Sequence, residues 1–376
     1  MSWPIDSLTI HRFRGLEELT LEGMGRINLL VGDNNSGKTS VLEALAIYDQ
    51  PLDELAWLST ARRRVQGFTS ISQIEALKWL FPHGKQAAED EDGLFTGDLS
   101  ISGSGSAGAR RLYAHLEEFE GIGEQGSLFQ LMHRSTRHQL RKKRLQEAAT
   151  LERGAALKLT LSTTTGIKER SFRIRDLADL ERTQADESVS IPVQILSPFD
   201  HAIEELYLGR FRKAVLQDYR ELVLEALQRI DPAIVEVEVL PTQDFRAALY
   251  LRHKRSGRTP VSAFGDGVRR VLLMALALPQ ATNGNLLIDE IETAIHISVL
   301  GEVFTWLVGA CKQRNVQLFA TTHSLEALDA ILAAGKEHPD EIVAYRFPDP
   351  ARPGPPKRYA GDQLHRLRYE RGLDVR

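Results

Sequence analysis

The chain has 376 residues, of which 42% are hydrophobic and 26% charged, and its formal net charge is −4. This composition is that of an ordinary globular protein, and no apolar run approaches the roughly 18 residues that a membrane span requires. The small negative charge excludes an overall attraction to nucleic acid, so any such binding must come from a local patch. The length exceeds the size at which one core stops growing, which favours a large domain with an insertion, or two lobes.

The N-terminus lacks the basic and apolar pattern of a signal peptide. The single Cys311 excludes an internal disulfide bond and lies in a helical apolar pattern, where core packing is its expected role. We therefore expect a cytoplasmic protein with no membrane contact.

Residues 5–22 alternate between apolar and polar side chains in two runs joined at Arg14-Gly15, which predicts an opening β-hairpin. Phe13-Arg14-Gly15 has two interpretations. The first is ordinary turn chemistry, because glycine is frequent in such turns. The second places Arg14 near bound phosphates.

Residues 32–39 fit the pattern G-x-x-x-x-G-K-[ST] without a substitution, and they lie between an apolar strand at 27–31 and a helical pattern that begins near Val41. This order predicts a nucleotide-binding loop whose backbone N–H groups and following helix face the phosphates. Lys38 would reach the terminal phosphates, and Thr39 would ligate Mg²⁺. The predicted nucleotide-binding residues are Gly32, Asn34, Asn35, Ser36, Gly37, Lys38, Thr39 and Ser40.

A change in composition near residue 84 marks a boundary, so we divide the chain into residues 1–83, an insertion at 84–189 and residues 190–376. Within the insertion, the small residues at 102–108 predict a flexible loop, and residues 156–175 predict a second hairpin. Residues 134–144 carry six basic and no acidic side chains. This block is the best candidate for contact with double-stranded DNA, although a solvated helix face or a protein contact is equally compatible, because no aromatic residues are interleaved with the charges.

Helical periodicity extends from His201 to Ile230 and predicts the longest helix of the chain. The segment from Ser262 to Arg270 then opens a further apolar helix with a serine and two glycines. Such a helix start suits a second phosphate-facing surface, and an ordinary glycine-rich turn with an N-cap is the alternative.

An apolar strand at 286–288 delivers Asp289 and Glu290 at its carboxyl end, where α/β sheets bind ligands. Asp289 would hold Mg²⁺ through water, and Glu290 would act as the general base that polarises the attacking water. A third apolar strand at 316–320 leads to His323, a candidate contact for the γ-phosphate, and to Ser324, which we expect to cap the next helix.

With these segments in order, the chain resembles the ATPase domain of the OLD-like (overcoming lysogenization defect) family. That family belongs to the wider ABC-type ATPases, which include chromosome-maintenance and DNA-repair proteins. The resemblance is carried by residues 13–15, 32–40, 262–270, 289–292 with His296, and 321–324. It implies an α/β fold, namely an ABC-type P-loop ATPase head with N-terminal antiparallel β elements and a helical/β insertion, which uses ATP and Mg²⁺.

In that family the serine-glycine segment of one subunit closes on the nucleotide held by another. The resemblance therefore implies a homodimer or higher homo-oligomer in which His296 lies along the interface. The residues implied to act in trans are Ser262, Gly265, Asp266 and Gly267. The segment departs from the Leu-Ser-Gly-Gly-Gln of transporters, and Gln194 lies inside a predicted strand, so we assign no glutamine loop.

Nuclease members of the family carry a C-terminal Toprim domain, and the roughly fifty residues after His323 are too few for that fold. We therefore expect a stand-alone ATPase without a nuclease domain, paired with a separate nuclease or effector protein in antiphage defence or DNA repair. The leading hypothesis is a Mg-dependent ATP hydrolase whose ATP-driven dimer acts on DNA or controls that partner. The alternative is an ATP-binding sensor or scaffold with negligible turnover. A transport ATPase is disfavoured because the transporter signature is absent.

Overall fold

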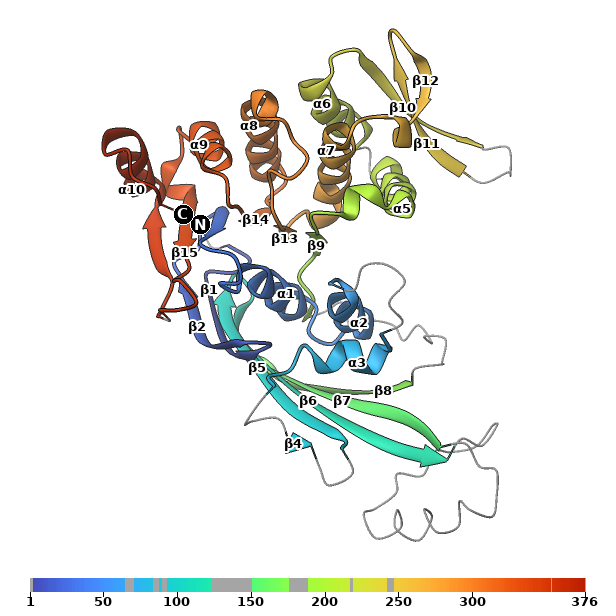
Figure 1. The fold of residues 1–376 in the computed structure, drawn as a ribbon, viewed down its shortest axis with the longest axis vertical. Helices are drawn as coiled ribbons and strands as arrows, with labels where there is room; N and C mark the ends of the chain where they lie inside the picture. The colour runs from blue at the N-terminus through green and yellow to red at the C-terminus, as the bar shows by residue number, and fades with distance from the viewer. Residues whose placement is uncertain are drawn as a thin grey trace.

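The protein consists of a mainly parallel sheet and an antiparallel sheet with helices above, between and beside them (Figure 1). The computed structural model describes residues 3–64, 71–83, 88–89, 93–122, 151–175, 189–216, 219–241, 247–352 and 354–375. The basic block at 134–144 lies outside these residues, so its role stays a prediction. None of the helices in the described ranges is long and apolar enough to span a membrane.

A six-stranded sheet forms the centre of the molecule, with strand order β16-β15-β3-β14-β13-β9. All neighbouring pairs are parallel except β15 and β16. The strands are β3 (Ile27–Val31), β9 (Val193–Leu196), β13 (Asn285–Ile288), β14 (Gln317–Thr321), β15 (Ile342–Arg346) and β16 (Lys357–Ala360). Every residue of β3, β13 and β14 is buried, as continuous apolar runs require in a parallel sheet covered on both faces. The predicted strands at 27–31, 286–288 and 316–320 are therefore confirmed.

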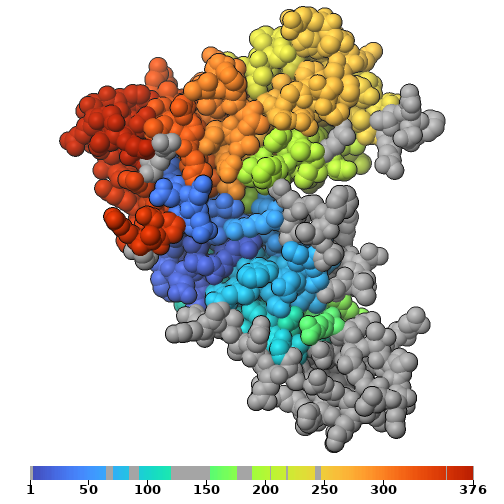
Figure 2. Space-filling model, viewed as in Figure 1, coloured from blue at the N-terminus to red at the C-terminus, as the bar shows by residue number. Residues whose placement is uncertain are grey.

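The two faces of this sheet belong to two separate hydrophobic cores, because successive side chains of a strand point in opposite directions. Leu286 and Ile288 enter a core with the helices on one face, whereas Leu287 enters a core shared with α1 and the antiparallel sheet. The helices of the first face are α6 (Arg220–Ile230), α7 (Asp266–Ala277), α8 (Ile297–Gln313) and α9 (Leu325–Ala334), with α10 (Gly361–His365) beside them. In the space-filling view, the blue N-terminal segments lie directly against the orange and red C-terminal ones (Figure 2). Cys311 of α8 is fully buried, as expected.

The antiparallel sheet has the order β2-β1-β5-β6-β7-β8, and β4 pairs with β5. Its strands are β1 (Ser7–Phe13), β2 (Leu16–Glu22), β4 (Ala88–Glu89), β5 (Phe95–Gly105), β6 (Gly108–Ile122), β7 (Leu151–Thr163) and β8 (Gly166–Arg175). The hairpins expected at 5–22 and 156–175 are confirmed. Because β5 pairs with β1, one sheet crosses the boundary placed near residue 84. The division into three parts stays a prediction.

The prediction of a flexible loop at 102–108 is wrong. Residues 102–105 belong to β5, and β6 begins at Gly108. A Cβ at Gly103 would lie 2.5 Å from the Ser7 carbonyl oxygen and 2.8 Å from the Tyr48 hydroxyl oxygen. The small residues here allow β5 to approach β1 and α1 closely, so they serve packing rather than mobility.

The single long helix predicted from His201 to Ile230 is also wrong, since the structure has α5 (Glu204–Leu216) and α6 instead. The amide of Tyr219 donates to the Ala214 carbonyl oxygen (3.0 Å), and Tyr219 precedes the first residue of α6. Apolar periodicity continues across the break because both helices pack into the same core. The N-terminal part holds two shorter helices, α2 (Glu54–Arg62) and α3 (Gln73–Lys78).

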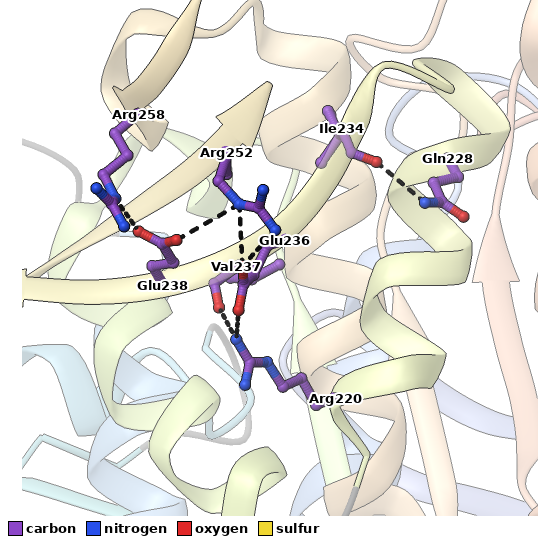
Figure 3. Close-up of polar contacts among 8 residues, drawn as sticks. All are labelled: Arg220, Gln228, Ile234, Glu236, Val237, Glu238, Arg252 and Arg258. Carbon is purple, nitrogen blue, oxygen red and sulfur yellow. Dashed lines mark hydrogen bonds and ion pairs between the residues drawn. The ribbon is translucent and has the colours of Figure 1, made fainter. Parts of the chain in front are cut away.

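A three-stranded antiparallel sheet lies beside α5 and α6, formed by β10 (Ile234–Pro241), β11 (Ala247–His253) and β12 (Gly257–Pro260). Side chains of α6 attach this sheet to the helix, because Arg220 donates to the Val237 carbonyl (3.1 Å) and Gln228 to the Ile234 carbonyl (3.0 Å) (Figure 3). Arginines on β11 and β12 pair with Glu236 and Glu238 across the exposed face.

A buried carboxylate at the end of α1 makes stability depend on pH. Asp49 is fully buried, and Asn285 donates to one of its oxygens (2.7 Å). Burial raises the pKa of Asp49 to about 7, although the Asn285 hydrogen bond and the nearby Arg110 act in the opposite direction. In the unfolded chain its pKa is near 4, so the native state holds the extra proton between about pH 4 and 7. The free energy of unfolding therefore falls as pH rises through that window, by up to about 4 kcal/mol.

Replacing Asp49 with asparagine is expected to remove this dependence, because the amide carries no charge and adds a donor beside the unpartnered Asn285 Oδ1. Urea denaturation should give similar midpoints for wild type and Asp49→Asn at pH 4.5, and a higher midpoint for the variant at pH 8. A difference between the two proteins that stays constant from pH 4.5 to 8 would contradict the assignment.

Candidate functional site

The strand order brings the three predicted site segments to one edge of the parallel sheet. β14 lies between β3 and β13, and all three strands run in the same direction. Residues 32–37 follow β3, residues 322–324 follow β14, and Asp289-Glu290 follow β13. Because carboxyl ends of parallel strands meet at one edge, the order of these segments along the sheet is set by topology.

The loop at 32–37 depends on its glycines. Gly32 and Gly37 have φ angles of 136° and 95°, in the region that other residues rarely adopt. A Cβ at Gly37 would lie 2.6 Å from Leu16 Cδ2, and one at Gly32 would lie 2.9 Å from the Phe347 carbonyl oxygen. No side chain caps α1 (Lys38–Asp49) at Gly37. Its first N–H groups are therefore available to an anion, as such helix starts often are.

Lys38 is buried, and its ammonium group lies over this loop. Nζ donates to the carbonyl oxygens of Gly32 (2.9 Å) and Asp33 (2.6 Å) and to the Ser36 hydroxyl (3.3 Å). Burial lowers the pKa of Lys38, while Asp289, Asp33 and Glu290 favour its charged form. Neutral carbonyl oxygens thus hold the charged ammonium group beside the loop. A phosphate can replace these carbonyls as the acceptor, because its negative charge makes the hydrogen bonds stronger.

A chain of hydrogen bonds joins the loop helix to the Asp289 carboxylate and to the backbone amide of Glu290. The Thr39 hydroxyl donates to the Asp289 carboxylate (2.9 Å), and the Thr321 hydroxyl donates to the same carboxylate (2.6 Å). The Glu290 amide in turn donates to the Thr321 hydroxyl oxygen (2.8 Å). The structure therefore brings Lys38, Thr39, Asp289 and Glu290 together as the sequence predicted, and Thr321 links them.

Glu290 occupies an unusual backbone conformation that its surroundings hold in place. Its φ is 47°, which is uncommon for a residue with a side chain, and its side chain is exposed at the sheet edge, where Thr293 donates to one carboxylate oxygen (3.0 Å). The fully buried Arg270 of α7 donates to the carbonyls of Asp289 (2.8 Å) and Glu290 (3.2 Å), and also to the carbonyl of Ser197. Burial lowers the pKa of Arg270 to about 10, so the guanidinium keeps its charge at pH 7.

His323 lies just beyond β14, between the strand ends that carry the loop and Asp289. Its backbone amide donates to the Glu292 carboxylate (3.0 Å). Ser324 caps α9, since its hydroxyl accepts from the Ala327 amide (3.0 Å), which confirms the expected cap. Contact between His323 and a γ-phosphate stays a prediction.

The predicted trans segment surrounds the start of α7 and is separate from the loop. Ser262, Gly265 and Asp266 are exposed, and Gly267 is half-buried, with 3.0 Å between a Cβ placed there and the Ala294 carbonyl oxygen. Within the described part of the chain, no hydrogen bond or ion pair joins residues 262–267 to residues 32–40. These residues are open to a second molecule rather than assembled in one chain.

Three other predicted residues have clear local roles. Arg14 lies in the β1–β2 turn with a φ of 53°, and its guanidinium pairs with the fully buried Glu43 (2.7 Å). His296 precedes α8 and accepts from the Ser298 amide (3.3 Å), so it caps that helix. Gln194 lies inside β9, as predicted, and its amide donates to the Val193 carbonyl.

Sequence reasoning missed two linking residues, Thr321 and Arg270. Both lie inside segments that were singled out, but each makes its contacts to a distant part of the chain. The available signal for Thr321 was its place at the carboxyl end of a strand beside β13. For Arg270 it was a charged residue directly before the apolar run at 271–278, where burial is uncommon unless the charge is paired or hydrogen-bonded.

The residues present fit ATP with Mg²⁺. The start of α1 has no side-chain cap and lies beside the ammonium of Lys38, and the adjoining hydroxyl of Thr39 and carboxylate of Asp289 are the oxygen donors that Mg²⁺ prefers. Mg²⁺ commonly takes one or two protein oxygens and completes its shell with phosphates and water. Thr39 and Asp289 are the residues that would hold it.

The sheet order, the loop and the strand-end carboxylates together define an α/β ATPase head of the ABC type, which confirms the predicted fold class. A family model described as "AAA domain, putative AbiEii toxin, Type IV TA system" matches residues 27–329. The chain belongs to this family of AAA-type P-loop ATPases. The narrower OLD-like resemblance stays a prediction.

Several individual proteins are similar to the chain. An "ATP/GTP phosphatase" of Helicobacter pylori is 19% identical over 347 residues, which cover 87% of each chain. "DNA replication and repair protein RecF" of Psychromonas ingrahamii is 31% identical over 102 residues, 27% of each chain. The crystal structure of an SmcHead bound to the C-winged helix domain of ScpA aligns over 98% of this chain and 99% of that one, with 11% identity and a TM-score of 0.46.

Two uncharacterized proteins of Methanocaldococcus jannaschii match shorter segments. They are 50% identical over 44 residues and 43% identical over 74 residues, which are 12% and 19% of this chain. The matched segments span 20% and 65% of those two proteins, less than two thirds of either.

Proposed function

We propose that the protein is a Mg-dependent ATP hydrolase whose ATP-bound form dimerises through the nucleotide site. The observation that carries this proposal is the hydrogen-bonded chain from Thr39 through Asp289 and Thr321 to Glu290, next to the buried Lys38. Phosphoryl transfer to water needs a phosphate cradle, a held metal ion and an oriented water, and these residues supply the protein groups for all three.

Each residue has a distinct task in this proposal. Lys38 exchanges its bonds to the Gly32 and Asp33 carbonyls for the terminal phosphates, and Thr39 with Asp289 holds the metal ion. Mg²⁺, when bound, neutralises charge on the phosphate oxygens. Glu290 accepts a hydrogen bond from the attacking water and takes its proton. His323 follows β14, which lies between the strands that lead to the loop and to Asp289, and it contacts the γ-phosphate.

A cleft of about 640 Å³ beside the loop offers space for the base and ribose of the nucleotide. Asn35, Ser36 and Gly37 line it together with Trp79, which is 52% exposed and stacks on His83 with 4.2 Å between ring centroids. An exposed aromatic pair is suited to stacking on a purine. We propose that adenine lies against Trp79.

The exposed start of α7 supports the proposed dimer. Ser262, Gly265, Asp266 and Gly267 lie away from the loop of their own chain, so a second copy would bring them to the nucleotide in trans. This arrangement supports a homodimer or higher homo-oligomer. Action on DNA is supported by the similarity to RecF, which is named a DNA replication and repair protein. A separate effector, in defence against phage or in repair, is the partner that such a dimer would control.

ATP binding is tested by Lys38→Ala. Loss of the ammonium should weaken binding of ATP with Mg²⁺ roughly 10- to 100-fold, because a charge-assisted hydrogen bond is lost. The readout is tryptophan fluorescence during an ATP titration, to which Trp79 contributes and which Trp79→Phe should reduce. Lys312→Ala, an exposed residue of α8, is the matched control.

The same titration is repeated with GTP, and the mass in solution is recorded at saturation. ATP should bind more tightly than GTP, and the wild type should double its mass with ATP. Equal ATP affinity in wild type and Lys38→Ala would overturn the nucleotide site, and a monomer at saturating ATP would overturn the dimer.

A further inference from the structure

A second cleft, of about 690 Å³, lies between α2 and α5 and contains none of the nucleotide-site residues. The two helices lie on either side of the end of β9 (Figure 1). We name it the α2–α5 cleft. The residues that give it its chemistry are Arg62, Arg63, Phe199, Asp200, Ile203 and Arg210.

The α2–α5 cleft has more positive than negative charge. Arg63 has only 15% of its side chain exposed, and its Nε forms no hydrogen bond, nor does Nη1 of the half-buried Arg210. The acidic residue of the cleft, Asp200, already accepts from the amide and the hydroxyl of Ser197 and lies 4.0 Å from Arg63. Burial lowers the pKa of both arginines, as expected for cations with too few partners.

A buried guanidinium N–H group without an acceptor is costly, and an anion with several oxygens could accept from the Nε of Arg63 and the Nη1 of Arg210. Arg63 and Arg210 line the same cleft, and, in addition to burial, the charge of Arg63 disfavours the charged form of Arg210 and lowers its pKa, which a bound anion would offset. A phosphate offers three or more acceptor oxygens and suits the planar guanidinium better than a single carbonyl does.

Apolar side chains also line the α2–α5 cleft, and two of them, Phe199 and Ile203, are 57% and 45% exposed. An exposed phenyl ring can stack on a flat heterocycle. The volume lies within the range of small-molecule sites, so a ligand that combines a phosphate with a planar apolar group matches both the arginines and the apolar side chains of the cleft.

Hydrogen bonds connect Ser197 of the α2–α5 cleft to the segment that carries Asp289 and Glu290. Ser197 contacts Asp200 and also accepts from Arg270, whose other hydrogen bonds reach the carbonyls of Asp289 and Glu290. A ligand that draws Arg63 away from Asp200 therefore changes the surroundings of a loop that Arg270 holds against Glu290.

We propose that the α2–α5 cleft binds a small phosphorylated ligand of the mononucleotide class, at a regulatory site separate from residues 32–40. Arg63 and Arg210 bind its phosphate, and Phe199 stacks on its base. The effect on turnover rests on the proposed ATPase function, whereas the binding itself does not.

Binding is measured in the full chain carrying Lys38→Ala, which weakens the first site, with AMP, inorganic phosphate and a ten-residue oligothymidylate as calorimetric probes. AMP should bind with one saturable site per chain and more tightly than phosphate. Arg63→Gln and Arg210→Gln should each weaken AMP binding roughly 10- to 100-fold. Arg212→Gln is the matched control, because Arg212 is exposed on the same helix outside the cleft.

Thermal unfolding of each variant identifies those that fail to fold, and Arg63→Lys or Arg210→Lys then replaces them. AMP binding that is lost in the cleft variants and kept in Arg212→Gln supports the proposal. No saturable AMP binding, or equal loss in Arg212→Gln, overturns it. Tighter binding of the oligonucleotide than of AMP overturns the small-ligand assignment and indicates nucleic acid in the cleft instead. Because turnover is not needed, failure here leaves the ATPase proposal intact.

Discussion

Glu290→Gln is expected to lower ATP turnover by roughly 10²- to 10⁴-fold, the usual contribution of a general base. The amide cannot take a proton from water, but it keeps the size of the side chain and can still accept from the Thr293 hydroxyl. In the described part of the chain, the side-chain and amide hydrogen bonds of Glu290 go to Thr293 and Thr321 rather than to the loop at 32–37, so ATP affinity should stay within about twofold of wild type. The variant should therefore accumulate as an ATP-bound dimer, because hydrolysis is the step that would release it.

The measurement is steady-state phosphate release together with mass in solution, with and without double-stranded DNA. Glu302→Gln on α8 is the matched control, since that carboxylate is exposed and pairs with Arg229 away from the site. Turnover that survives Glu290→Gln would remove the residue from the mechanism. Tight ATP binding without turnover in the wild type itself would favour the sensor or scaffold alternative.

The parallel sheet and its catalytic edge could be predicted because their signals are local. Each central strand is a short apolar run followed at once by polar residues, and a buried parallel strand allows few other patterns. The loop at 32–39 adds fixed glycine positions that only this backbone path requires. The apolar runs of the strands and the loop at 32–39 together predict that Lys38, Thr39, Asp289 and Glu290 lie at one edge of the parallel sheet. This prediction needs no knowledge of contacts between distant residues.

What could not be predicted depends on contacts between distant segments. Gly103 resembles a linker residue in sequence, yet it is small because β1 and Tyr48 approach it. The break between α5 and α6 leaves the apolar period intact, since both helices face one core. Thr321 and Arg270 act through partners that are 32, 19 and 73 positions away in the chain, and no periodicity reports such a bond.

Substitutions of Arg270 are expected to have the second large effect, on stability and on turnover, because this one buried side chain joins three parts of the site. It reaches from α7, which begins with the predicted trans segment, to the Ser197 carbonyl after β9 and to the carbonyls of Asp289 and Glu290 after β13. Arg270→Met fills similar volume but leaves three carbonyl oxygens without this donor. Its free energy of unfolding is expected to fall by about 3 kcal/mol.

Arg270→Lys separates stability from positioning. The lysine keeps the charge, but an ammonium on a flexible stem cannot hold the planar arrangement of three carbonyls. With the left-handed conformation of Glu290 no longer fixed, kcat should fall roughly 10- to 100-fold while KM for ATP changes little, because Arg270 touches neither Lys38 nor the loop. Steady-state kinetics of the variant, compared with Arg229→Lys on α6, whose guanidinium pairs with Glu302 away from the site, measures this. If kcat is kept and only the melting temperature falls, Arg270 is a packing residue, and the start of α7 is not coupled to Glu290 through it.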